Sequence, residues 1–549
     1  MDAFNLFANL VDIEARRIMP AEVEVRNGRI HAVREVGGPV EGYLIPGFID
    51  AHVHVESSML VPSEFARLAV VHGTVATISD PHEIANVLGE EGVEYMIENG
   101  AQVPFHFFFG APSCVPATRF ETAGAELDAA AVGRLLDRPE VLYLSEVMDF
   151  PGVINGDPEV MRKIAHAHRT GKVVDGHAPG LRGEGAARYI RGGDEHGGVV
   201  ISTDHECFTL EEALDKVQHG MHISIREGSA ARNLDALMPL LLSHPEKVML
   251  CCDDTHPDSL VLGHINSLCK RAVTAGVDVF DVLRAACLNP IAHYKLPVGH
   301  LHVGDPADMV LLENLMDFKV LRTWVRGQLV AEKGRSLIRS VPAGTPNKFN
   351  CAEIAEAQLR VPAKDDQILA IEALDGQLIT HKKYLHGTVR NGELVADVDR
   401  DLLKIAVVNR YATAPVALGW IRNIGLKRGA IASCVAHDSH NIVAVGANDA
   451  DLCEAINAVI AQRGGISVCD AGVVQALPLP VAGIMSTADA YEVAAAYAAL
   501  DGAAKALGST LRAPFMTLSF MALLVIPHVK LSDKGLFDGD AFELITSGT

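Results

Sequence analysis

The chain has 549 residues and a formal net charge of -22, from 69 acidic and 47 basic side chains. This length exceeds that of a usual single domain, so we expect two or three domains. The acidic balance and the lack of a Lys/Arg-rich run disfavour a surface for nucleic acid or anionic membrane, and they favour a small neutral substrate. The ten cysteines form no CxxC pair, which predicts reduced and mostly buried thiols.

No targeting or membrane segment is predicted. The N-terminal stretch lacks a basic region followed by an apolar core, so it does not resemble a secretory signal. Residues 515–527, the most apolar late stretch, are too few to span a bilayer and end in proline. We therefore expect a cytoplasmic protein in which this stretch is a buried core element.

Strand patterns flank a central region at both ends. Residues 21–34 alternate around an Asn-Gly dipeptide, which suits a two-residue hairpin turn. Residues 304–312 and 320–330 show the same kind of strand and turn. We expect the two ends to pair into a composite β-sandwich of residues 1–45 and 296–340.

The central region alternates short apolar runs with helix-like segments. The clearest runs are residues 74–78, 141–144, 172–174, 199–202, 222–225 and 248–251. Alternating strands and helices indicate parallel βα units, so residues 46–295 predict an α/β fold with a (β/α)8 TIM-type barrel. The active sites of such barrels form at the C-terminal ends of the strands.

A further domain is expected after the barrel. Residues 341–366 are rich in proline, alanine and charge, which is typical of a linker. Residues 367–549 then show turn signals and helical patterns, with helices expected at 449–463 and 487–500. This C-terminal domain is predicted to be α/β or α+β.

Polar residues stand where the predicted barrel strands end. His52 and His54 are two residues apart on the first strand, so their imidazoles face the same side and can reach one metal ion. The later strand ends carry Asp80, His82, Glu146, His177, His205, Glu206, Arg226, Glu227, Asp253 and Asp254. These side chains predict a site with metal-ligand and acid–base chemistry.

This order of residues resembles the amidohydrolase superfamily of metal-dependent hydrolases over residues 21–335. The resemblance implies a binuclear divalent metal site with the ligands His52, His54, Glu146, His177, His205 and Asp253. A carboxylated lysine often bridges the two metals in that superfamily, but residues 139–153 contain no lysine. Glu146 is assigned the bridging role because a carboxylate can bind two metals through its two oxygens.

The last-strand aspartate of the superfamily contacts the metal and also handles a proton. Asp253 is assigned this role. Asp254 stays open as a hydrogen-bonding neighbour or the true ligand, since adjacent strand residues point in opposite directions. Ligands of this kind accommodate Mn, Fe, Zn or Co. The resemblance favours Mn²⁺, with Fe²⁺ or Zn²⁺ as alternatives.

Several segments resemble the adenine deaminase family in particular. They are Ser79–Val87, Pro112–Thr118, Ile225–Ser229, Cys252–Pro257 and Ala436–Gly446. The resemblance extends over nearly the whole chain and implies the hydrolytic deamination of adenine to hypoxanthine and ammonia in purine salvage and adenine catabolism, by a metal-activated hydroxide. The single-zinc deaminase fold is disfavoured because no PCxxC signature is present.

Deamination also requires a proton at N1 of adenine, which a nearby carboxylic acid can supply. The candidates are Glu206, Glu83 and Glu227, with Glu206 slightly preferred because it adjoins a proposed ligand. Substrate contacts are expected from Asp80, His82, Ser113, Arg226 and Asp254. The segment His437-Asp438-Ser439-His440 can stabilise its own domain, contact the barrel mouth as a lid, or hold a second metal site.

Other functions stay open at this point. The same metal site can deaminate another aminated heterocycle or open a cyclic amide, although the missing lysine weighs against ring opening. A catalytically silent barrel scaffold is the alternative that is not an enzyme, and a failure to bind metal would favour it. The expected partners are adenine as a small-molecule substrate and further copies of the chain in a homodimer or larger homo-oligomer.

Overall fold

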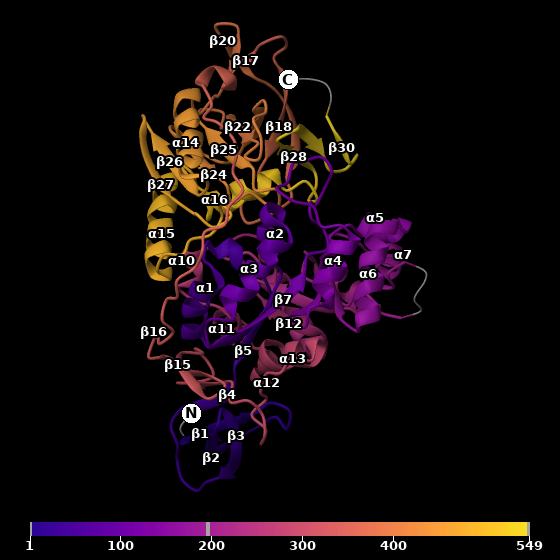
Figure 1. Cartoon of the computed structure of the whole chain (residues 1–549), viewed down its shortest axis with the longest axis vertical. Helices are drawn as coiled ribbons and strands as arrows, with labels where there is room; N and C mark the ends of the chain where they lie inside the picture. Colours follow the sequence, from indigo (N-terminus) through magenta and orange to yellow (C-terminus); the bar gives the residue numbers. More distant parts are fainter. Residues whose placement is uncertain (1–2, 194–197, 546–549) are drawn as a thin grey trace.

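The structure is a computed structural model that describes residues 3–193 and 198–545. Three parts follow one another along its long axis: a sheet at the N-terminal end, a barrel in the middle and a second sheet domain at the other end (Figure 1). Within the two described ranges, no helix is long and apolar enough to cross a membrane.

The first part is an eight-stranded sheet that combines segments from before and after the barrel. In spatial order its strands are β16 (Arg335–Ser336), β15 (Gln328–Glu332), β14 (Val320–Val325), β13 (Met309–Leu312), β4 (Tyr43–Pro46), β1 (Phe4–Asp12), β2 (Arg17–Arg26) and β3 (Arg29–Glu35). β4 and β13 are antiparallel neighbours, with Ile45 opposite Val310. The sheet curls so that the rings of Phe4 and Trp324 stack with their centroids 6.1 Å apart. The chain therefore enters and leaves the barrel at one place.

The second part is a ring of parallel strands, and the predicted α/β barrel fold is confirmed. The strands are β5 (Phe48–Val53), β6 (Thr74–Ser79), β7 (His106–Ala111), β8 (Val141–Val147), β9 (Val173–Gly176), β10 (Thr203–Asp204), β11 (His222–Arg226) and β12 (Val248–Cys251). Parallel bridges from Val174 to Ile201 and from Val53 to Asp253 close the ring. The strands are apolar runs in the sequence because both of their faces are buried.

One barrel strand lies later than its sequence pattern predicts. The run at residues 199–202 was expected to be a strand, but β10 covers only Thr203–Asp204. Val199 is 48% exposed, and the run joins β9 only at its end, through a bridge at Ile201 and hydrogen bonds from Ser202 to Val174. The apolar run therefore leads into the barrel wall and contributes little to it.

Helices surround the ring. They are α1 (Pro62–Ala69), α2 (His82–Leu88), α3 (Glu90–Gly100), α4 (Ala129–Asp137), α5 (Phe150–Asn155), α6 (Pro158–Thr170), α7 (Gly183–Ile190), α8 (Leu210–Gln218), α9 (Leu234–Ser243), α10 (Pro257–Leu260), α11 (Ile265–Thr274), α12 (Val279–Leu283) and α13 (Asn289–Tyr294). The sequence fixes the ends of α6 clearly. Asp157 accepts hydrogen bonds from the first-turn N–H groups, and Gly171 ends the helix with a φ of 69°.

The third part is a second eight-stranded sheet. Its strands are β19 (His381–His386), β18 (Gln367–Glu372), β23 (Ala417–Arg422), β22 (Leu403–Val408), β25 (Ile442–Gly446), β24 (Ala430–Ser433), β26 (Ile466–Asp470) and β27 (Val473–Leu477). The accompanying helices are α14 (Asp449–Gln462), α15 (Ala490–Ala506) and α16 (Pro514–Ser519). Asp489 caps α15, which is why this helix starts later than its apolar pattern predicts.

The C-terminal domain is seated on the barrel through contacts from several segments. Ser486 exchanges backbone hydrogen bonds with the segment that precedes α1. Asp489 accepts from Arg67 at 2.7 Å, and Asp533 accepts from the backbone N–H of Thr122 at 2.9 Å. These contacts therefore fix the position of the C-terminal domain on the barrel.

Candidate active site between the barrel and the C-terminal domain

Strand β5 brings His52 and His54 to one side of the barrel mouth, as side-chain alternation requires. Their Nε2 atoms lie 3.2 Å apart, and both residues are buried. Asp50 lies behind them, where its Oδ1 accepts the backbone N–H groups of His52 and Cys252. Asp50 therefore ties β5 to β12 and fixes the position of the histidine pair.

The carboxylate of Glu146, near the end of β8, lies at the centre of a histidine cluster. Its Oε2 is 2.8 Å from His177 Nδ1 and 3.3 Å from His205 Nε2. Its Oε1 is 3.2 Å from both His54 Nε2 and His82 Nδ1. Burial favours the neutral acid, but the hydrogen bonds from these histidines hold the pKa of Glu146 well below its ordinary value. Glu146 is thus an anionic centre shared by four imidazoles.

Asp253 follows β12 and faces the β5 histidines from the other side. Its Oδ1 is 3.4 Å from His52 Nε2 and 3.2 Å from His54 Nε2. Its Oδ2 accepts a hydrogen bond from Arg226, which also binds both oxygens of Glu206. Burial opposes ionisation of Asp253, but the charge of Arg226 lowers its pKa well below the ordinary value. Asp253 is therefore held in the anionic form, which a carboxylate ligand of a metal must have.

Asp254 also lines this cavity, although strand alternation predicts that it points away from Asp253. The alternation fails because Asp253 has a φ of 59°, so the chain is no longer extended at this residue. The Oδ1 of Asp254 accepts a hydrogen bond from Ser57 Oγ at 2.5 Å and lies 3.8 Å from His437 Nε2. Both carboxylates after β12 are therefore available to the site.

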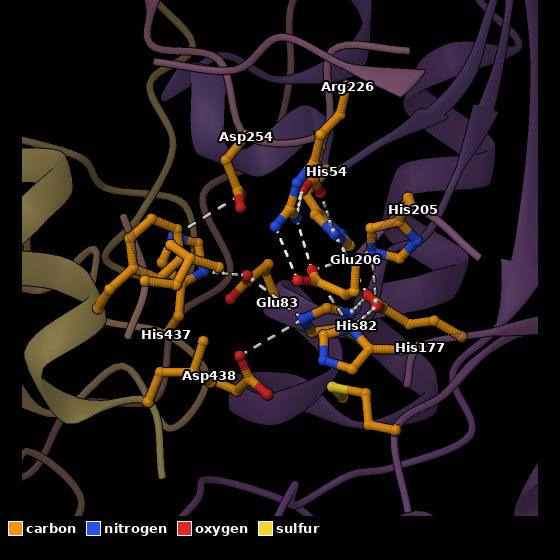
Figure 2. Close-up of a pocket in the computed structure, with 16 residues that line it drawn as sticks. His54, His82, Glu83, His177, His205, Glu206, Arg226, Asp254, His437 and Asp438 are labelled. Carbon is orange, nitrogen blue, oxygen red and sulfur yellow. Dashed lines mark hydrogen bonds and ion pairs between the residues drawn. The ribbon is translucent and has the colours of Figure 1, made fainter. Parts of the chain in front are cut away.

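The C-terminal domain closes the cavity over these residues. Figure 2 shows His437 and Asp438 entering from that domain and facing the barrel side chains. The cavity between the two domains is small, with a volume of about 30 Å³. Its lining is His54, His82, Glu83, Glu146, Met148, His177, His205, Glu206, Arg226, Asp253, Asp254, Leu378, His437, Asp438, Phe520 and Leu523. The site is incomplete without the second domain.

Glu83, in the first turn of α2, is held across the boundary between the domains. One carboxylate oxygen contacts His437 Nδ1 and the other contacts His440 Nε2. Burial opposes ionisation of Glu83, but the two histidine charges lower its pKa well below the ordinary value. Burial likewise opposes the charge on His437, while Glu83 raises the pKa of this histidine to about 9. The pair therefore holds a proton beside the cavity.

Two protein-family models and several named relatives match this chain. Residues 43–330 match the model of the amidohydrolase family, and residues 377–543 match that of the adenine deaminase C-terminal domain. A Salinibacter ruber protein named adenine deaminase is 54% identical over 99% of this chain and 98% of its own length. Proteins with the same name from Methanosarcina acetivorans and Sulfurovum sp. are 51% and 52% identical over 98% of this chain, covering 98% and 99% of their own lengths. The chain belongs to the adenine deaminase family.

The adenine deaminase family has an amidohydrolase domain, which implies a divalent metal, and the donors in this chain fit one. Donor atoms that lie within 4.8 Å of one another form the groups His52–His54–Asp253, His52–Glu146–His205, His177–His205–Glu206 and His54–Asp80–His82–Glu146, among others. The Nε2 atom of His177 is buried and has no hydrogen-bond partner among the described residues. Imidazole and carboxylate groups without thiolate suit Mn, Fe or Zn.

Four predicted site residues of this adenine deaminase family member do not line the cavity, namely His52, Asp80, Ser113 and Glu227. Glu227 follows Arg226, whose side chain points inward, so alternation directs Glu227 outward, where its Oε1 lies 2.5 Å from Arg271. The expectation that Glu227 is a candidate acid is not supported by this position. Ser113 is buried and donates to the backbone oxygen of Glu146 at 2.6 Å, so it helps to hold the backbone of Glu146 in place.

Asp80 and His82 lie closer to the metal-binding cluster than their predicted role in substrate binding suggests. His82 Nδ1 is 3.1 Å from Asp80 Oδ2 and 3.2 Å from Glu146 Oε1. Asp80 does not line the cavity and accepts a hydrogen bond from Ser145 at 2.7 Å. His82 therefore faces the site, and Asp80 orients it from behind.

Sequence reasoning missed the apolar wall of the site in this family member. Leu378, Phe520 and Leu523 of the C-terminal domain form this wall together with Met148 of the barrel. The only signal was the apolar stretch at 515–527, which predicts burial without indicating what covers it. Sequence reasoning also missed the contacts of Glu83 with His437 and His440, because these histidines are far from Glu83 along the chain.

Proposed function

We propose that this chain deaminates adenine by hydrolysis, giving hypoxanthine and ammonia, as a step of purine salvage. The observation that carries the proposal is the buried cluster at the barrel mouth, where Glu146 meets four histidines and Asp253 stands opposite. It occurs in a chain that is 54% identical, over nearly its full length, to a relative named adenine deaminase.

The proposed metal ligands are His52, His54, Glu146, His177, His205 and Asp253. The two oxygens of Glu146 face different histidines, which supports a bridging role and a binuclear site. We propose Mn²⁺ as the metal, with Fe²⁺ and Zn²⁺ as alternatives, because the donors are imidazole and carboxylate. Bound divalent ions would lower the pKa of water and so supply the nucleophile at neutral pH.

Asp253 is proposed to carry the proton of the attacking water. Arg226 occupies its Oδ2, while its Oδ1 faces His52 and His54. This ionised oxygen accepts a proton as the water attacks C6 of adenine. It then returns this proton to the departing amine, and the C6–N bond breaks as C6=O forms, so that ammonia leaves and the second proton of the water replaces the one that the acid gives to N1.

Glu83 is proposed as the acid that protonates N1 of the base. Both oxygens of Glu206 bind Arg226, so Glu206 is committed to an ion pair, and Glu227 lies outside the cavity. Glu83 lines the cavity and shares a short contact with His437, from which it can draw a proton. Protonation at N1 lets the ring accept electron density during attack.

The remaining predicted substrate contacts divide into two groups. His82 and Asp254 line the cavity and are proposed to face the substrate. Arg226 also lines it, but its donors are used by Glu206 and Asp253, so we propose that it positions these carboxylates. We propose that Asp80 acts only by orienting His82, and that Ser113 acts only by holding the backbone of Glu146.

Manganese-loaded protein incubated with adenine tests the proposal directly. Ammonia release and the ultraviolet change should occur with adenine and not with adenosine, guanine, cytosine or dihydroorotate. Glu146→Gln and Asp253→Asn should abolish both signals. Metal-loaded protein that leaves adenine untouched would contradict the substrate, and turnover of dihydroorotate would favour ring opening instead.

The chain's organisation and setting are proposed on separate grounds. We propose a composite sandwich of residues 1–45 and 296–340, a barrel at 46–295, a linker at 341–366 and a C-terminal domain at 367–549.

All ten cysteines are free thiols, which supports a reducing, cytoplasmic location. Analytical ultracentrifugation would test the proposed homodimer or larger homo-oligomer.

A further inference from the structure

His437 presents a buried nitrogen to the cavity, and no side chain or backbone group in the described part of the chain pairs with it. The residue is 2% exposed and lines the cavity between the domains. Its Nδ1 contacts Glu83, whereas its Nε2 has no hydrogen-bond partner among the described residues. Oδ1 of Asp254 lies 3.8 Å from Nε2, which is too far for a hydrogen bond. A buried polar atom of this kind is costly unless something in the cavity binds it.

The position of this nitrogen is fixed by contacts on two sides. Phe520 stacks on the His437 ring with centroids 4.7 Å apart and an interplanar angle of 16°. The contact between Nδ1 and Glu83 sets the rotation of the ring about its own axis. Figure 2 shows the His437 side chain facing Glu83 and Asp254 on the barrel side of the cavity, with a dashed line to each. The free nitrogen is therefore held in place before any ligand arrives.

We propose that His437 Nε2 donates a hydrogen bond to N3 of the substrate base, so that the C-terminal domain reads the edge of the purine next to N1. The proposal rests on the adenine deaminase function proposed above, in which Glu83 meets N1. Because His437 is hydrogen-bonded to Glu83, the two side chains lie side by side and contact the same edge of the purine ring. N3 is the other acceptor on that edge.

The surroundings of His437 favour the donor form of its Nε2. The carboxylate of Glu83 accepts from Nδ1, and Asp254 lies on the opposite side of the ring. Burial works against a charged imidazole, yet Glu83 and Asp254 raise the pKa of His437 to about 9. In this form both ring nitrogens donate, and Nε2 is the one without an acceptor among the described residues.

The test compares adenine with 3-deazaadenine and 7-deazaadenine in manganese-loaded enzyme. His437→Asn keeps a donor at the position of Nδ1, which holds Glu83, and deletes the nitrogen that faces the cavity. For each protein the preference is the ratio of kcat/KM for adenine to kcat/KM for 3-deazaadenine. We expect this ratio to be about 10- to 100-fold larger in wild-type enzyme than in His437→Asn. Where an analogue is not turned over, its inhibition constant replaces kcat/KM.

His440→Asn is the matched control. His440 also contacts Glu83 but does not line the cavity, so its replacement should lower the rates for all three bases in proportion. Equal preference for adenine over 3-deazaadenine in His437→Asn and wild type would overturn the proposal, as would a lost preference against 7-deazaadenine alone. If wild-type enzyme with full metal content leaves adenine untouched, the underlying function fails instead. Metal content and the unfolding midpoint of each variant confirm that the fold is intact.

Discussion

Arg226 binds both carboxylate oxygens of Glu206, with nitrogen–oxygen distances of 2.5 and 2.7 Å. Both residues are almost fully buried, and the same guanidinium also donates to Asp253. One cation therefore neutralises two acids inside the barrel mouth. Neither water nor salt can replace it there, because buried charges are weakly screened.

Arg226→Met should destabilise the protein by about 3–5 kcal/mol, because it leaves Glu206 and Asp253 as uncompensated buried charges. Urea unfolding measures this change. Arg271→Met is the control, since Arg271 is partly exposed, pairs with the largely buried Glu227 and the exposed Asp235, and should cost less, about 1 kcal/mol. Equal losses in the free energy of unfolding for the two variants would show that Glu206 and Asp253 do not need Arg226 to neutralise their charges.

Glu83→Gln should lower kcat for adenine by about 10²- to 10⁴-fold, because the variant cannot pass a proton to N1. The metal content should not change. Glu227→Gln should leave kcat within about two-fold, since Glu227 points away from the cavity. A larger loss of kcat in Glu227→Gln than in Glu83→Gln would reverse the assignment of the acid.

Glu146→Gln should bind less metal and lose thermal stability in manganese-containing buffer. Metal that binds only the folded state stabilises it by mass action, about 2.7 kcal/mol at a hundredfold excess over Kd. Elemental analysis and thermal melts, with and without chelator, measure both effects. The chelator should lower the melting temperature of wild-type protein and leave that of Glu146→Gln nearly unchanged. An equal response of both proteins would mean that Glu146 binds no metal.

Lys530→Met should stabilise the protein near neutral pH. Lys530 lies on β28 (Val529–Ser532), is fully buried, and donates to the backbone oxygen of Leu378 at 2.5 Å. Burial lowers its pKa from 10.5 to about 7. This shift costs about 4 kcal/mol at neutral pH, and loss of the hydrogen bond costs about 1–3 kcal/mol, so a net gain of about 2 kcal/mol is expected.

The sign of the pH dependence follows from proton binding. Between pH 7 and 10.5 the unfolded chain holds the lysine proton and the folded chain does not, so wild-type stability rises with pH. The advantage of Lys530→Met should therefore shrink as the pH approaches 10. Urea unfolding of both proteins at pH 7 and 9.5 measures the difference in their free energies of unfolding. A constant difference would show that the amine titrates normally.

The sequence predicts the barrel and its strand-end residues well because both follow local rules. Alternation along β5 places His52 and His54 together, and the same alternation explains why Arg226 enters the cavity while Glu227 does not. The rule fails at Asp253 and Asp254, where a positive φ turns both carboxylates inward. No pattern of residue types indicates that local departure.

The other half of the site depends on contacts between segments that are distant in the chain. Glu83 meets His437 and His440 only because the second domain docks on the barrel. Phe520 belongs to an apolar stretch that local pattern can only assign to a core. Burial explains its composition, but the partner that buries it is set by tertiary packing, which periodicity does not encode.

The pairing of Ile45 with Val310 across β4 and β13 has a consequence for the order of folding. These strands become neighbours only when the chain between them, which forms the entire barrel, has become compact. Closing such a long loop carries an entropic cost that no local contact repays beforehand. The strand pairs β1–β2 and β14–β15 can form early from adjacent segments, whereas the seam between β4 and β13 closes late and marks completion of the barrel.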